Sequence, residues 1–244
     1  MATAVVAAVK HVMGTGTSYS ASNAGGAGAT SVFVMVNDAA SVSSGTYGGV
    51  ALAEVTKAEN NPDIFLWAAG GVPAGNQTFS LVWASSGRSA TAWVITTSGV
   101  NGGKVNDTYS VTGVAETPHP TQTLDSKPNG IAFDCMMFAK NSSAVHYAPD
   151  TGQTELFDEQ PNGWATWGAS YEVASSTSVV MGISCDGSPA DRYGYFAASF
   201  DPPRGGSQVI TAAIRLWRDF LRDLKADLVP ANEFQRRYGH LLAI

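Results

Sequence analysis

Short apolar or alternating runs, separated by turn residues, dominate the first 200 positions of the chain. In the run NQTFSLVW (76–83), Phe79, Leu81 and Trp83 fall on one face of an extended strand. Strands are predicted in the same way at 31–37, 46–55, 63–67, 76–83, 91–99, 108–114, 130–139, 165–173, 177–185 and 193–200. Closely spaced short strands with Gly, Pro and Asn between them are typical of an antiparallel sandwich or barrel.

No helical period interrupts residues 1–200, and no exact internal repeat is evident. The pattern therefore predicts a mainly β fold, an antiparallel β-sandwich of the jelly-roll or immunoglobulin-like kind, as one domain over 1–201. Residues 116–130 contain three prolines and few apolar side chains, which favours a long loop. A seam between two halves is the alternative, but neither half shows a complete strand set.

A different pattern follows the strands. Pro202, Pro203 and two glycines mark 202–206 as a linker, and Ser207 is a candidate helix N-cap. Beyond it, apolar residues recur at alternating steps of four and three, which predicts an amphipathic helix in a C-terminal segment, 207–244. The expected assembly residues are Ile210, Ile214, Trp217, Leu221, Leu224 and Leu228, with Phe220 widening the stripe.

The charge distribution separates the same two regions. The net charge is −6, yet residues 204–244 carry seven basic and four acidic side chains. An acidic body argues against nucleic acid as a partner, and a cationic segment suits an acidic protein surface. Packing of this segment on its own sandwich is the alternative to docking on another chain or on a second copy.

The N-terminal apolar run, Ala4–Val9, has no basic residue before it and is too short to cross a membrane. We therefore expect no signal peptide and no membrane partner. The two cysteines, Cys135 and Cys185, lie in apolar runs, which favours buried free thiols over a disulfide.

The residues give no motif for catalysis. The four histidines have no metal-ligand spacing, and no G-x-S-x-G nucleophile motif is present. The neighbouring carboxylates Asp158 and Glu159 would point opposite ways on a strand. We therefore expect no enzyme activity, no catalytic residues, no metal and no cofactor. Trp164, Trp167 and Tyr171 are candidate contacts for a glycan or a partner, because exposed aromatic faces stack on sugar rings; core packing is the alternative.

The order of the strands SVFVMVN, YGGVAL and DIFLW, followed by a P-x-G turn, the strand TFSLVW, SGVN and finally AASFDP, resembles a group of β-sandwich proteins. These proteins occur among phage virion components and in modules of secreted bacterial proteins. The resemblance covers about residues 1–202 and implies a jelly-roll or immunoglobulin-like sandwich with a role in display or attachment. It carries no catalytic signature.

We therefore expect a non-enzymatic bacteriophage structural protein, made in the host cytoplasm and located in the virion. Capsid decoration, a head spike or fibre, and a tail-attached accessory are the candidate places. The expected partners are capsid or tail proteins, or a second copy, bound through the C-terminal segment, with a cell-surface glycan as a candidate target. A carbohydrate-binding β-sandwich module is the alternative.

Overall fold

The computed structural model describes residues 2–38, 42–59, 63–83, 90–115, 117–138, 146–159, 166–186 and 191–203. These residues contain seventeen strands and no helix. The first nine strands are β1 (Ala4–Met13), β2 (Ser18–Asn23), β3 (Ser31–Asp38), β4 (Val42–Tyr47), β5 (Val50–Ala51), β6 (Ala53–Glu59), β7 (Asp63–Gly70), β8 (Gln77–Trp83) and β9 (Ala90–Ser98). The others are β10 (Val105–Ala115), β11 (Thr121–Asp125), β12 (Ile131–Phe138), β13 (Tyr147–Pro149), β14 (Thr154–Glu159), β15 (Thr166–Val173), β16 (Ser178–Cys185) and β17 (Asp191–Phe200).

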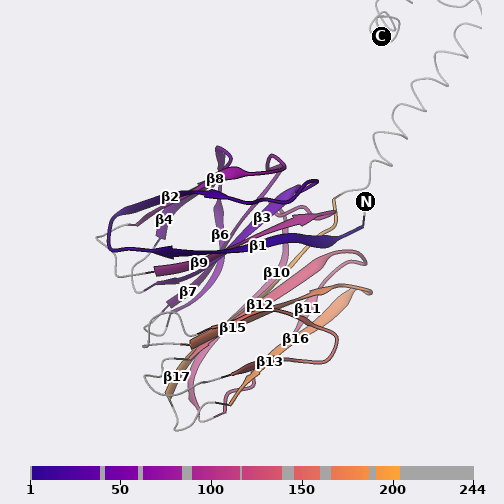
Figure 1. The fold of residues 1–244 in the computed structure, drawn as a ribbon. Helices are drawn as coiled ribbons and strands as arrows, with labels where there is room; N and C mark the ends of the chain where they lie inside the picture. The colour runs from indigo at the N-terminus through magenta and orange to yellow at the C-terminus, as the bar shows by residue number, and fades with distance from the viewer. Residues whose placement is uncertain are drawn as a thin grey trace, which may run out of the picture. The chain divides into compact units, whose positions relative to one another are not determined.

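The strands form four antiparallel sheets, two in each half of the described chain (Figure 1). Lobe 1, β1 to β9, has an inner sheet β1-β9-β3-β7-β6 and an outer sheet β2-β8-β4-β5. Lobe 2, β10 to β17, has an inner sheet β10-β17-β12-β15-β14 and an outer sheet β11-β16-β13. The two lobes have the same strand order, except that the two-residue β5 has no counterpart in lobe 2.

Two β-bulges also occur at matched places in the lobes. The first strand of each lobe has one, between Val5 and Ala7 in β1 and between Val105 and Asp107 in β10. The edge strands β6 and β14 have another, immediately after Glu54 and Glu155. Because a bulge fixes the register of the strands around it, positions in one lobe can be matched residue by residue to the other. The chain is thus a structural repeat that its sequence does not reveal.

Three hydrophobic cores lie between the four sheets. The shared core, between the two inner sheets, takes its buried residues from both lobes. The other two cores lie between the inner and outer sheet of each lobe. In Figure 1 the strands accordingly lie in layers, with β2 and β8 on one side and β13 and β16 on the other.

The central strands of the inner sheets, such as β7, β9 and β12, are buried on both faces, which explains their continuous apolar runs. In β3, Phe33 and Met35 enter the shared core, while Val34 enters the core of lobe 1. The ring of Phe33 lies 4.6 Å from the ring of Phe133 in β12 and 4.6 Å from that of Phe200 in β17. Aromatic contacts across the centre of the shared core thus join the two lobes.

The mainly β, antiparallel class predicted from the sequence is confirmed, and Cys135 and Cys185 are buried free thiols as expected. The interpretation of 116–130 as one long loop is wrong, because this range contains β11, which pairs with β16. Only Leu124 of that strand is buried, so the hydrophobic signal was weak. In the described ranges, the structure contains no helix that is both long and apolar enough to cross a membrane.

Candidate functional site

Of the aromatic residues expected to contact a glycan, Trp167 and Tyr171 belong to the described structure. Trp167 is fully buried in the shared core, with its ring 4.6 Å from that of Phe157. Tyr171 is partly buried against the same core, 6.4 Å from Phe133 between ring centroids. The ring of Trp167 therefore has no face to offer to a sugar. Trp164 lies outside the described residues.

The assembly residues also lie outside the described residues, together with the whole predicted helix. These are Ile210, Ile214, Trp217, Phe220, Leu221, Leu224 and Leu228. Their role as a docking seam stays a prediction.

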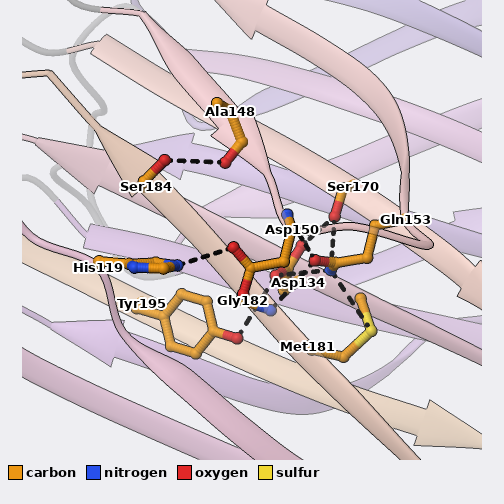
Figure 2. Close-up of polar contacts among 10 residues, drawn as sticks. All are labelled: His119, Asp134, Ala148, Asp150, Gln153, Ser170, Met181, Gly182, Ser184 and Tyr195. Atoms are coloured by element: carbon orange, nitrogen blue, oxygen red, sulfur yellow. Dashed lines mark hydrogen bonds and ion pairs between the residues drawn. The ribbon is translucent and has the colours of Figure 1, made fainter.

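The main polar cluster of the described structure lies in the core of lobe 2, around Asp134 of β12 (Figure 2). Asp134 is fully buried. Its Oδ1 accepts a hydrogen bond from the Ser170 hydroxyl at 2.6 Å. Its Oδ2 accepts one from the Gln153 amide at 3.2 Å and one from the Tyr195 hydroxyl at 3.4 Å. We call Asp134, Gln153, Ser170 and Tyr195 the Asp134 cluster.

Gln153 connects this cluster to the outer sheet. It precedes β14 directly, and its Nε2 also donates to Ser170 Oγ at 2.9 Å. Its Oε1 accepts hydrogen bonds from the backbone N–H of Asp150 at 2.9 Å and of Gly182 at 3.3 Å. Gly182 belongs to β16, the central strand of the outer sheet. One side chain therefore spans from the buried carboxyl to the outer layer.

Burial dominates the electrostatics of the cluster. It raises the pKa of Asp134 to about 6, although the hydrogen bonds from Ser170, Gln153 and Tyr195 favour the charged form and lower it. Burial also raises the pKa of Tyr195, and the neighbouring Asp134 charge raises it further. Among the described residues, no Lys, Arg or His forms an ion pair with Asp134. The cluster can therefore hold a proton up to about pH 6.

A surface pair lies beside the cluster, as Figure 2 shows. His119 Nε2 lies 2.7 Å from Asp150 Oδ1, and both side chains are partly exposed. The Asp150 backbone N–H donates to the Gln153 side chain, which in turn donates to Asp134, so one side-chain amide connects the surface pair to the buried carboxyl. In Figure 2 Ser170 faces Asp134 and Gln153, and its hydroxyl donates to the carboxylate. The Ser170 hydroxyl thus donates to Asp134 and accepts from Gln153.

A second cluster lies where the described chain ends. The Asp201 carboxylate is buried and accepts from Lys104 Nζ at 2.7 Å and from Lys127 Nζ at 2.5 Å. Its backbone carbonyl accepts from the Asn101 N–H at 3.0 Å. Burial alone would raise the pKa of Asp201, but the two lysines outweigh it and lower the pKa. We call Asp201, Lys104 and Lys127 the C-terminal clamp.

The carboxylates of β14 bind separate partners. His146 Nδ1 lies 2.9 Å from Asp158 Oδ2, and this hydrogen bond raises the pKa of the exposed His146. Glu159 instead forms an ion pair of 2.6 Å with Lys10 of lobe 1. The two neighbouring carboxylates therefore bind different partners, one within lobe 2 and one in lobe 1.

Within the described ranges, no group of three or more His, Cys, Asp or Glu residues is arranged to hold a metal ion. No known protein-family model matches the chain, and no curated protein matches it.

The sequence analysis missed both clusters, although each left a signal. Asp134 interrupts the apolar run IAFDCMMFA, and Asp201 follows the last strand in AASFDPP. A charged residue inside a buried strand is rare unless it is paired. Its partners, however, are distant in sequence, and Gln153 and Ser170 resemble ordinary loop and strand residues.

Proposed function

We propose that the chain is a non-enzymatic structural protein of a bacteriophage virion, in which the two-lobed body is displayed and the C-terminal segment docks on the particle. The resemblance of residues 1–202 to virion and surface β-sandwich proteins supports this proposal. The docked segment, 207–244, contacts a capsid or tail protein, or a second copy, through its predicted apolar stripe. Capsid decoration, a head spike or fibre, and a tail accessory are all consistent with it.

Each lobe is proposed to be a jelly roll. In lobe 2 the inner sheet contains the first, eighth, third and sixth strands in that order, and the outer sheet contains the second, seventh and fourth. Lobe 1 has the same order. Viral capsid and lectin domains use such double-sheet folds. The fifth strand, β14 or β6, pairs on the edge of the inner sheet.

The observation that carries the proposal is the C-terminal clamp. A displayed body needs a fixed point where its attachment segment begins. Asp201 lies just after the last strand, and Lys104 and Lys127 bind it from two different connections, before β10 and β12. The Thr3 hydroxyl lies 2.8 Å from the carbonyl oxygen of Gly99 and 2.5 Å from that of Asn129, so it joins the end of lobe 1 to lobe 2 nearby.

The chemistry of the described residues supports a structural role. Asp134 and Asp201 accept hydrogen bonds from neighbouring side chains, and Asp158 and Glu159 bind different partners. The burial of Trp167 leaves the carbohydrate-binding alternative with no support from that ring.

The first test compares the solution mass of the full chain with that of a chain ending at Pro203, by light scattering. We expect the full chain to associate and the shortened chain to be a folded monomer. Trp217→Asp and Leu221→Asp should abolish association without changing the β-type circular dichroism. Arg222→Ala, outside the apolar stripe, is the matched control and should associate as the wild type does.

A shortened chain that does not fold would contradict the proposal, because the segment would then belong to the core of the body. A full chain that stays monomeric would exclude a second copy as the partner. The same substitutions would then be tested for incorporation into virions during infection, and normal incorporation of Trp217→Asp would contradict docking through the stripe.

A further inference from the structure

The matched registers of the two lobes show that the Asp134 cluster replaces apolar residues. In lobe 1, Val34 pairs with Trp67 and Glu54 also pairs with Trp67; in lobe 2, Asp134 and Glu155 both pair with Ser170. Both glutamates immediately precede the matched bulges. Val34 is therefore the counterpart of Asp134, and Trp67 that of Ser170.

Two further matched positions also differ between the lobes. Leu52 directly precedes β6 as Gln153 precedes β14, and Leu52 is buried in the core of lobe 1. Ala92 pairs with Val36 as Tyr195 pairs with Met136. All four counterparts in lobe 1 belong to its hydrophobic core, and they are Val34, Leu52, Trp67 and Ala92. A fold that is stable with an apolar group at this place carries an ionisable one in lobe 2.

Asp134 is connected to both sheets of lobe 2, directly or through Gln153. Ser170 and Tyr195 belong to β15 and β17, the neighbours of β12 in the inner sheet. Gln153 comes from the turn between β13 and β14 and contacts the outer sheet at Gly182 and at the Met181 sulfur, 3.5 Å from Nε2. A change of charge at Asp134 therefore acts directly on the residue that joins the outer sheet to the inner one.

We propose that Asp134 is a proton-operated lock on the outer sheet of lobe 2: the neutral acid holds β11-β16-β13 tightly on the inner sheet, and the carboxylate loosens it. A buried carboxylate without a cation is stabilised by any opening that admits water. Opening between the sheets at Gln153 provides that hydration. The neutral acid has no such need and can donate its proton to a neighbouring oxygen.

Other ionisable groups lie on the elements around Asp134, and their titration could also affect the exchange rates. Tyr195 comes from β17, Tyr147 from β13 and Cys185 from β16, and Asp150 lies in the turn with His119 against it. Burial raises the pKa of both tyrosines, which keeps them neutral near pH 7. His119 and Asp150 are therefore the groups whose contribution has to be separated from that of Asp134.

Amide hydrogen exchange of the full chain tests the lock, because lobe 1 serves as an internal reference. The amides of β16 around Val179 and Met181 are compared with those of β8 around Phe79 and Leu81, after division by the intrinsic exchange rates. We expect protection of β16 relative to β8 to fall roughly tenfold between pH 5 and pH 8. Asp134→Asn should remove this dependence.

Three controls sharpen the result. Asp125→Asn removes an exposed carboxyl from the same outer sheet and should keep the wild-type response. His119→Ala should also keep it. If Asp134→Asn does not fold, Asp134→Val replaces it, because valine is the counterpart residue in lobe 1. The comparison of β16 with β8 in the wild-type protein needs no substitution and therefore does not depend on either variant.

Equal pH dependence of β8 and β16 in the wild type would overturn the proposal. It would also be overturned if Asp134→Asn or Asp134→Val kept the response, or if His119→Ala removed it. None of these outcomes involves residues 207–244. The proposed lock can therefore fail while the proposed virion function stands, and the virion function can fail while the lock stands.

Discussion

The two lobes have one topology and two different interiors. At matched positions, lobe 1 contains Val34 and Leu52, whereas lobe 2 contains Asp134 and Gln153. Lobe 1 instead has a polar cluster elsewhere, where His11 Nε2 lies 2.8 Å from Asn23 Oδ1. The counterpart of His11 in lobe 2 is Val111, which pairs with Tyr195 as His11 pairs with Ala92. The strand order thus tolerates polar groups in either place, provided that their partners change together.

The shared core and the outer core of each lobe have different roles in the body. The shared core, where Phe33 meets Phe133 and Phe200, joins the lobes into one structure. The outer cores are free to diverge, because each serves only its own lobe. The Asp134 cluster accordingly lies between the inner and outer sheets of lobe 2, where it affects the core of one lobe alone.

We expect the largest loss of stability when a carboxyl group is introduced into lobe 1, at the position that matches Asp134. Val34→Asp should lower the free energy of unfolding by about 5 kcal/mol at pH 8, because an uncompensated buried charge is costly. The counterparts Leu52 and Ala92 have no side-chain donors, unlike Gln153 and Tyr195. Urea unfolding measures the loss. Val34→Ala is the control, and an equal loss in both variants would mean that the donors of lobe 2 do not matter.

We expect the next largest loss of stability when an aromatic side chain of the shared core is truncated. Phe33→Ala removes a fully buried ring that touches two aromatic rings of lobe 2, and we expect a loss of about 4 kcal/mol. Phe79→Ala, in the core of lobe 1 alone, is the matched substitution. Exchange measurements should show that Phe33→Ala weakens protection in both lobes. An effect confined to lobe 1 would contradict the joining role of the shared core.

The pH dependence of stability should distinguish Asp134 from an ordinary acid. Its pKa in the folded chain is about 6, against an ordinary value of 3.8. Between these values the folded chain binds a proton that the unfolded chain does not, so stability falls as the pH rises through this window. The total contribution is roughly 3 kcal/mol. Urea titrations of wild type and Asp134→Asn measure it, and equal slopes between pH 4 and pH 6 would contradict the assignment.

The smallest of these effects concerns the C-terminal clamp. Asp201→Ala should cost about 2 kcal/mol, because it removes two charge-assisted hydrogen bonds whose lysines then return to water. The lowered pKa of Asp201 gives the opposite sign from Asp134: its contribution is present above the ordinary Asp pKa and is lost as the pH falls through the lower, folded value. Thermal unfolding of Asp201→Ala and Lys104→Ala checks this, and a larger loss for Lys104→Ala would place the main contact elsewhere.

The sequence predicted the central strands of the inner sheets, since burial on both faces gives them continuous apolar runs such as SVFVMVN (31–37). It did not predict the edge strands β1 and β14. It did not predict the repeat, because the lobes share burial and bulges while the matched residues differ, as Val34 and Asp134 do. It left core packing of Trp167 as the alternative to a glycan contact, and this ring is buried. A Cβ at Gly168 would lie 2.5 Å from the Tyr147 ring, so this glycine permits close packing.

The partners of Asp134 were beyond sequence reasoning for a related reason. Ser170, Gln153 and Tyr195 meet it only because three pairings of β12, β14, β15 and β17 fix one register. A local pattern indicates which face of a strand a residue occupies. It does not indicate which residue of a distant strand lies opposite.

We expect the two matched lobes to fold as one unit through their shared core. Pulse-labelling hydrogen exchange of the wild-type chain across a urea gradient at pH 5 tests it, with peptides from β3 reporting on lobe 1 and peptides from β12 on lobe 2. We predict that the two sets lose protection at the same urea concentration. Separate midpoints, with one lobe still protected after the other has unfolded, would contradict it.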